Sequence, residues 1–86
     1  MERIIIDVRE PSEYARGHYG GAINIPPSKL LGELPELQDV PKDAQLIVYC
    51  LSGSRSNAAM HILSDRGFTN VINGINQEHV AAKFGR

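Results

Sequence analysis

The sequence has one cysteine, Cys50, no tryptophan, and almost no excess of charge of either sign. A lone cysteine cannot form an internal disulfide and cannot supply the several thiolates of a structural metal site. The formal net charge of −1 provides no basic surface that could neutralise nucleic-acid phosphates. These absences exclude a disulfide-stabilised fold, a thiolate-rich metal domain and charge-driven nucleic-acid binding.

Long hydrophobic runs are also missing. No apolar stretch approaches the roughly 20 residues that span a bilayer, so no membrane partner is expected. Residues 1–3 lead into an apolar segment of only three isoleucines, and no signal peptide is visible. The sequence therefore predicts a cytoplasmic protein, or a periplasmic one where a leader has been removed.

The composition is that of an ordinary globular domain. With 86 residues, 42% hydrophobic and 22% charged, the chain is long enough for a single domain over residues 1–86. Its histidines, His18, His61 and His79, are too scattered to indicate a metal site, and we expect no cofactor. For His18 a role in capping a turn is favoured over acid–base chemistry.

Hydrophobic patterning predicts strands that alternate with helices. The apolar runs 4–8 and 46–49 are typical of strands buried on both faces, and 22–25 and 68–72 predict two further strands. Helices are predicted over 10–16, over 28–37 with Ser28 as N-cap and a break at Pro35, from Arg55 to Gly67, and over 79–84. Asn73-Gly74 predicts a turn. The expected fold is α/β, with a central parallel sheet of about four strands flanked by short helices.

Cys50 lies at the predicted carboxyl end of the second buried strand, where open parallel sheets bind their ligands. The short loop that follows contains Gly53, which can take unusual dihedral angles, and it runs into a helix. Such a loop can point backbone N–H groups at one spot, and the helix adds its own free N–H groups and positive dipole end. These donors would favour a reactive thiolate and bind an anion above it.

Side chains of the loop strengthen this interpretation. Arg55 adds a permanent positive charge, and Ser52, Ser54 and Ser56 add hydroxyl donors. The alternative is a tight turn that holds an inert, buried thiol, because strand–loop–helix junctions are routine in α/β folds. From the loop alone both possibilities remain open.

Three segments resemble the rhodanese family in the order expected for that family. The first contains Asp7-Val8-Arg9-Glu10-Pro11-Ser12-Glu13-Tyr14, Gly17-His18 and Gly21-Ala22-Ile23-Asn24-Ile25-Pro26. The second, Ile47-Val48-Tyr49-Cys50 with Ser52-Gly53-Ser54-Arg55-Ser56, looks like the active-site strand and loop. The third, Gly67-Phe68-Thr69-Asn70-Val71, resembles the turn into the last strand.

This resemblance implies a thiosulfate sulfurtransferase. Cys50 would take the outer sulfur of thiosulfate, release sulfite and hold a persulfide, which cyanide, a thiol or a protein acceptor then removes. The loop amides of residues 51–56 would cradle the persulfide, and Arg55 would help to place the anion. Asp7 and Arg9 would form a buried structural pair near the site.

Some residues depart from the family pattern. Tyr19-Gly20 replaces the usual isoleucine-proline, Asn73-Gly74 stands where paired glycines are usual, and the usual nearby tryptophan is missing, so we expect a looser C-terminal cap. Leu51 is apolar where a charged residue would strengthen anion binding. It could form a hydrophobic lip for an acceptor or simply pack on a neighbour, and the sequence favours neither.

Three other functions were weighed. Related cysteine-loop phosphatases and arsenate reductases have five residues between cysteine and arginine, whereas four separate Cys50 from Arg55. The shorter loop suits a sulfur atom better than a tetrahedral phosphate. A non-catalytic binding module would usually lack the cysteine. A sulfur carrier loaded by a persulfidated protein would use the same Cys50 chemistry and stays open as an alternative.

Overall fold

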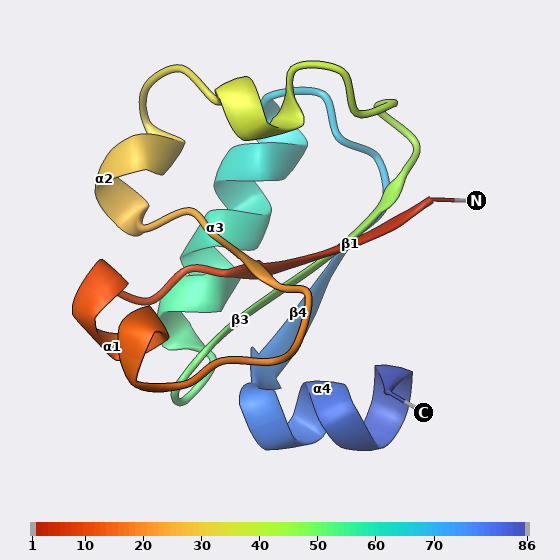
Figure 1. The fold of residues 1–86 in the computed structure, drawn as a ribbon. Helices are drawn as coiled ribbons and strands as arrows, with labels where there is room; N and C mark the ends of the chain where they lie inside the picture. Colours follow the sequence, from red (N-terminus) through yellow and green to blue (C-terminus); the bar gives the residue numbers. More distant parts are fainter. Residues whose placement is uncertain (1, 86) are drawn as a thin grey trace.

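The computed structural model describes residues 2–85, which fold around one four-stranded parallel sheet. The strands β1 (Arg3–Asp7), β2 (Ile23–Asn24), β3 (Gln45–Cys50) and β4 (Val71–Asn76) lie in the order β2-β1-β3-β4 (Figure 1). The helices are α1 (Pro11–Arg16), α2 (Pro27–Leu30), α3 (Ser54–Asp65) and α4 (Gln77–Phe84), with a 3-10 turn, η1, at Pro35–Leu37. The predicted α/β class and its parallel sheet are confirmed.

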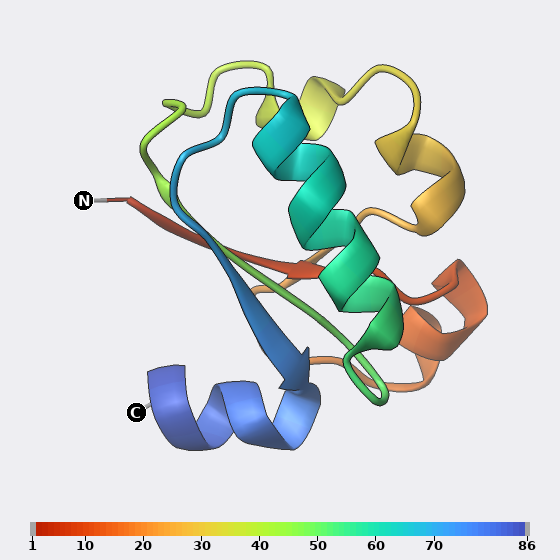
Figure 2. The ribbon, with the colours of Figure 1, turned by 180° about the vertical axis from the view of Figure 1, so that it is seen from behind.

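Helices cover both faces of the sheet, as Figures 1 and 2 show from opposite sides. On one face, Leu30 of α2, Leu37 of η1 and Leu63 of α3 pack on alternate residues of the central strands. On the other face, Val80 of α4 packs against Ile47 and Tyr49 of β3. Because β3 is covered on both sides, its residues Leu46 to Cys50 are all buried, which explains its continuous apolar run.

The last strand differs from the sequence prediction. The predicted strand 68–72 begins later, at Val71, and continues through Asn73-Gly74, so the predicted turn at these two residues is wrong. Gly74 forms an irregularity in the ladder, because Asn73 pairs with Val48 and Ile75 already pairs with Tyr49. A Cβ on Gly74 would lie 2.7 Å from Val80 and 2.9 Å from Ile47. The lack of a side chain at Gly74 therefore lets α4 pack closely on the sheet, and this glycine does not form a turn.

The segment between β2 and β3 contains two short helical pieces, as the break at Pro35 predicted. The N-cap of α2 is Pro26, however, and not Ser28, which lies inside the helix. The first helix is fixed by a capping box between Glu10 and Glu13. Within residues 2–85, no helix is both long and apolar enough to cross a membrane.

Candidate active site

The sulfur of Cys50 lies at the carboxyl end of β3, where the chain turns into α3. Cys50 is only 1% exposed. The turn consists of Leu51, Ser52 and Gly53, and Gly53 has a positive φ of 97° that directs its N–H back to the sulfur at 3.1 Å. Non-glycine residues rarely adopt this backbone conformation, so Gly53 gives the loop its shape.

Hydrogen-bond donors surround the Cys50 sulfur. Besides the Gly53 amide, the Ser56 amide donates to the sulfur at 3.4 Å, and the Ser56 hydroxyl oxygen lies 3.5 Å away. Burial by itself would raise the pKa of the thiol. The hydroxyl of Ser56 and the amides of Ser56, Gly53 and Ser52 outweigh burial and lower the pKa to about 7. A substantial part of Cys50 is therefore the nucleophilic thiolate at neutral pH.

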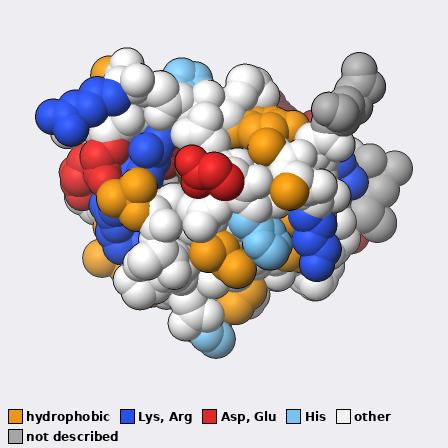
Figure 3. All heavy atoms as spheres, turned by 90° about the horizontal axis from the view of Figure 1, so that it is seen from below, with side chains coloured by type: hydrophobic (Ala, Val, Ile, Leu, Met, Phe, Trp, Pro, Cys, Tyr) orange, Lys and Arg blue, Asp and Glu red, His pale blue; other side chains and the backbone are white. Residues whose placement is uncertain are grey.

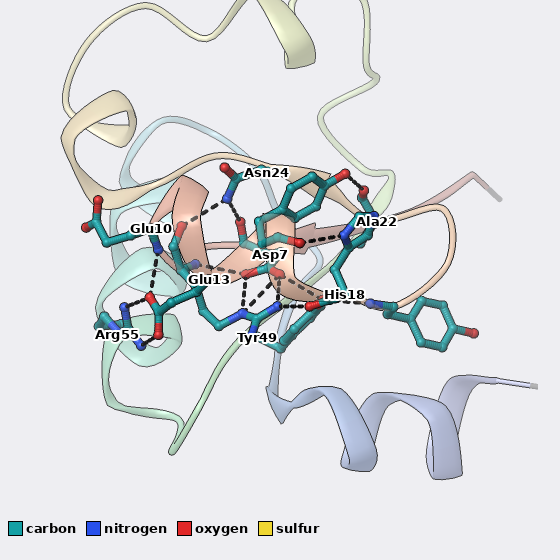
Figure 4. Close-up of polar contacts among 12 residues, drawn as sticks. Asp7, Glu10, Glu13, His18, Ala22, Asn24, Tyr49 and Arg55 are labelled. Atoms are coloured by element: carbon teal, nitrogen blue, oxygen red, sulfur yellow. Dashed lines mark hydrogen bonds and ion pairs between the residues drawn. The ribbon is translucent and has the colours of Figure 1, made fainter.

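Arg55 turns toward helix α1 instead of standing free above the sulfur. Its two guanidinium nitrogens donate to the two carboxylate oxygens of Glu13 at 2.8 and 3.1 Å (Figure 4). Arg55 still interacts electrostatically with Cys50, but Glu13 balances much of its charge. Hydrogen bonds from Arg55 and then from the Glu10 amide lower the pKa of Glu13 to about 2. Glu13 is thus a residue of the site that the sequence did not single out.

Asp7 and Arg9 form a buried ion pair at the end of β1, as the family resemblance implied. Arg9 donates to the Asp7 carboxylate through Nε at 2.9 Å and through a terminal nitrogen at 2.6 Å. The Tyr49 hydroxyl donates to the same carboxylate at 2.9 Å and accepts from the Tyr19 amide at 3.0 Å (Figure 4). Burial, together with the hydrogen bond to Asp7, raises the pKa of Tyr49 to about 12. This network joins the loop after β1 to the strand that carries Cys50.

A surface pocket of about 350 Å³ opens beside the cysteine loop and is lined by Arg9, Glu13, Arg16, Gly17, Leu51 and Gln77. Leu51 is 58% exposed where it lines this pocket, so its side chain is not buried against a neighbour. The protein is seen from below in Figure 3, which shows basic and acidic side chains grouped beside hydrophobic ones. Another pocket, of about 370 Å³, has no lining residue from the cysteine loop.

The sequence patterns did not single out Arg16 and Gln77, which line this pocket. Arg16 is exposed and has no ion pair within residues 2–85, so its charge is available in the pocket. A basic residue in the last turn of a short helix is common, and nothing in the pattern marked it as part of a site. Of the loop serines, Ser52 and Ser54 are exposed, whereas Ser56 is buried against the sulfur.

His18 has the role that was favoured for it. Its Nδ1 lies 2.9 Å from the Tyr14 carbonyl oxygen, and its ring stacks on the Tyr14 ring with centroids 3.6 Å apart. These contacts hold the end of α1 and the loop that follows it. They assign His18 to structure and give it no contact with Cys50.

The fold is thus a parallel α/β sheet, and the Cys50 sulfur accepts hydrogen bonds from amides at the carboxyl end of the inner strand β3. Comparison with known proteins then decides the family. The family model "Rhodanese-like domain" matches residues 1–75. The chain belongs to the rhodanese-like domain family.

Two relatives carry sulfurtransferase names. The chain is 40% identical over 72 residues to the thiosulfate sulfurtransferase PspE of Escherichia coli, an alignment that covers 79% of this chain and 64% of the relative. It is 32% identical over 71 residues to a sulfurtransferase of Allochromatium vinosum, covering 81% and 63%. The chain thus spans less than two thirds of the length of either relative.

Solved structures agree with the family. A structure described as rhodanese with anions, from E. coli, superposes with a TM-score of 0.80 at 36% identity, covering 92% of each chain. A human single-domain sulfurtransferase superposes with a TM-score of 0.78 at 26% identity, covering 95% of this chain and 83% of the human one. The similarity therefore extends over nearly all of the fold, including the strand and loop that hold Cys50.

Proposed function

We propose that this protein is a thiosulfate sulfurtransferase in which Cys50 carries the transferred sulfur. One observation carries the proposal: the Cys50 sulfur accepts hydrogen bonds from loop and helix amides that lower its pKa to about 7. The family and the sulfurtransferase names of two relatives support the same chemistry.

The reaction proceeds in two displacements. In the first, the Cys50 thiolate attacks the outer sulfur of thiosulfate, the S–S bond of thiosulfate breaks, and sulfite leaves with the bonding electron pair. Cys50 then holds a persulfide anion. In the second, cyanide or the thiolate of an acceptor attacks the terminal sulfur, which leaves as thiocyanate or as the acceptor's persulfide, and the Cys50 thiolate is restored. This is ping-pong chemistry with a covalent intermediate.

The groups around the sulfur fit an anionic donor and an anionic intermediate. The amides of Gly53 and Ser56 that stabilise the thiolate are placed to stabilise the persulfide anion as well. In the adjoining pocket, Arg16 supplies a positive charge that no carboxylate of residues 2–85 pairs with, and Arg55 adds the part of its charge that Glu13 leaves uncompensated. The exposed Leu51 offers an apolar contact for the acceptor that enters second.

Intact mass spectrometry tests the proposal directly. Incubation with thiosulfate is expected to add one sulfur atom to the protein, and cyanide is expected to remove it. Cys50→Ser should show no gain, whereas Ser64→Ala, an exposed serine on α3, should behave as the unchanged protein.

Each alternative predicts a different result. A sulfur carrier would gain no sulfur from thiosulfate but would gain it from a persulfidated protein donor. A phosphatase would release phosphate from an aryl phosphate and would leave thiosulfate untouched. Either result would overturn the proposed use of thiosulfate.

A further inference from the structure

The hydroxyl of Ser56 faces two groups that can accept its proton. Its oxygen lies 3.5 Å from the Cys50 sulfur and 2.6 Å from Oδ1 of Asn73, which reaches the site from β4. Ser56 is completely buried, so its hydroxyl does not contact bulk solvent. Because a serine hydroxyl has a single proton, it cannot donate to the sulfur and to Asn73 at the same time.

The orientation of the Asn73 amide is set by two backbone groups. Its Nδ2 donates to the Gly53 carbonyl oxygen at 3.1 Å, and its Oδ1 accepts from the Ile75 amide at 2.9 Å. A carbonyl requires a donor and an amide N–H requires an acceptor, so the side chain has one orientation that satisfies both. Asn73 therefore presents an oxygen to Ser56, and the hydroxyl proton lies on that short contact. In this state the hydroxyl oxygen can only accept from the Cys50 thiol.

We propose that Asn73 is a positioning residue. It accepts the hydrogen bond of the Ser56 hydroxyl while Cys50 is a thiol, and the hydroxyl donates to the sulfur instead when Cys50 ionises. The thiol state then contains a continuous chain in which the S–H donates to the Ser56 hydroxyl and the hydroxyl donates to Asn73. After ionisation the hydroxyl turns and becomes a third donor to the sulfur, beside the amides of Gly53 and Ser56. Asn73 and the thiolate thus compete for the one hydrogen bond that the Ser56 hydroxyl can donate.

This competition sets how acidic the thiol is. An acceptor that stabilises the thiol state opposes ionisation, so Asn73 keeps the pKa of Cys50 higher than the donors alone would make it. At the same time, the bond from Asn73 to the Gly53 carbonyl holds the loop in shape. The two roles have opposite effects on the pKa of Cys50, and a suitable experiment can separate them.

Asn73 and Ser56 are uncharged, and the charges around the site are on other residues. They are Arg55 of α3, which interacts electrostatically with Cys50, its partner Glu13 and Glu10 at the start of α1, and, around the adjoining pocket, Arg9 and Arg16. Strand β4 has no charged residue, and α4 contributes the neutral Gln77 to the pocket. Substitutions at Asn73 and Ser56 to uncharged residues therefore leave the surrounding charges in place.

A double-mutant cycle measures the competition. The pKa of Cys50 is determined from the pH dependence of alkylation by iodoacetamide in the unchanged protein, Asn73→Ala, Ser56→Ala and the double variant. Ser56→Ala is expected to raise the pKa, because the thiolate loses a donor. Asn73→Ala is expected to lower it by about one unit when Ser56 is present, and not to lower it when Ser56 is absent. Ser64→Ala serves as the control and should leave the pKa unchanged.

Asn73→Ala also removes the hydrogen bond to the Gly53 carbonyl and so loosens the loop. The cycle cancels this effect on the pKa of Cys50, because it is the same with and without Ser56. If Asn73→Ala raises the pKa equally in both backgrounds, or changes it in neither, Asn73 does not compete for the Ser56 proton and the proposal is overturned.

Should Asn73→Ala fail to fold, Asn73→Asp replaces it, since aspartate is nearly the same size and keeps an acceptor oxygen. Its charge should raise the pKa of Cys50, and more so with Ser56 present than absent. Equal rises would contradict the proposal.

The inference rests on the proposed function only in taking Cys50 as the reacting group. Its readout is the protonation of the thiol, measured without thiosulfate. A cycle with the expected coupling in a protein that takes no sulfur from thiosulfate would retain the role of Asn73 and reject the substrate. Sulfur transfer without coupling would do the reverse.

Discussion

The guanidinium of Arg55, in the first turn of α3, binds both carboxylate oxygens of Glu13 in α1. The two residues are 42 positions apart in the sequence, and Figure 4 shows their side chains facing each other between α1 and α3. It also reduces the positive field that Arg55 exerts on Cys50 and on an incoming anion. The charge of Arg55 is thus partly balanced by Glu13.

Opposite effects are expected when either member of this pair is changed. Glu13→Gln leaves Arg55 uncompensated and should lower the KM for thiosulfate, whereas Arg55→Ala should raise it, each by about two- to fivefold at low salt. Steady-state kinetics with cyanide as a fixed acceptor gives both values. Changes of KM in the same direction would show that the pair acts only by holding α1 in place.

The same pair predicts how stability falls in acid. The pKa of Glu13 is lowered to about 2 in the folded protein, below its ordinary value of about 4.3. The stabilisation that the ionised Glu13 gives the fold is therefore complete above the ordinary pKa of a glutamate, and it is lost as the pH falls toward 2. Urea unfolding at several pH values should show a smaller loss of stability for Glu13→Gln than for the unchanged protein in this interval. Parallel curves would contradict the assignment.

Alkylation of Cys50 should follow a thiolate with a pKa of about 7. Above this pH the rate with iodoacetamide should be nearly constant, and below it the rate should fall about tenfold per pH unit, because only the thiolate reacts. Protein unfolded in urea serves as the control, and its rate should instead have a midpoint near 8.5, the value of a free thiol. The same midpoint before and after unfolding would mean that the loop amides do not stabilise the thiolate.

Tyr49→Phe should destabilise the protein by about 1–3 kcal/mol, because it leaves the half-buried Tyr19 amide without its acceptor and removes one of the donors to Oδ2 of Asp7, which keeps its bonds from Arg9. Tyr19→Phe is the matched control, since the hydroxyl of Tyr19 has no hydrogen bond within residues 2–85. Chemical denaturation measures both. A Tyr49→Phe protein as stable as the control would show that the hydroxyl contributes nothing to the network.

Ile75 has a φ of 72°, which is strained for a β-branched residue. Glycine would relieve this strain, so Ile75→Gly is expected to be about 1–2 kcal/mol less destabilising than Ile72→Gly. Ile72 is also half-buried on β4 and provides the comparison. The two free energies of unfolding come from urea titrations. Equal losses would mean that Ile75 is not strained.

Much of the fold could be predicted because its determinants are local. A continuous apolar run such as 46–49 is sufficient to indicate a strand buried on both faces, and Cys50 directly after it must lie at a carboxyl end. Pro35 prevents one continuous helix over 28–37, because proline lacks the N–H that a helix interior needs, and it begins η1 instead. The turn predicted at Asn73-Gly74 failed because the same dipeptide serves a second purpose, the close packing of α4 against Gly74, which depends on residues distant in sequence.

By itself, the sequence determined that a single thiol ends a buried strand and is followed by a flexible loop and a basic residue. Only the tertiary structure decided how the charges and protons around that thiol are shared. Arg55 is partly neutralised because folding brings Glu13 to it, and the Ser56 proton is contested because β4 places Asn73 within hydrogen-bond distance. Such partnerships depend on distances of a few ångströms between segments far apart in the chain, and no local pattern encodes those distances.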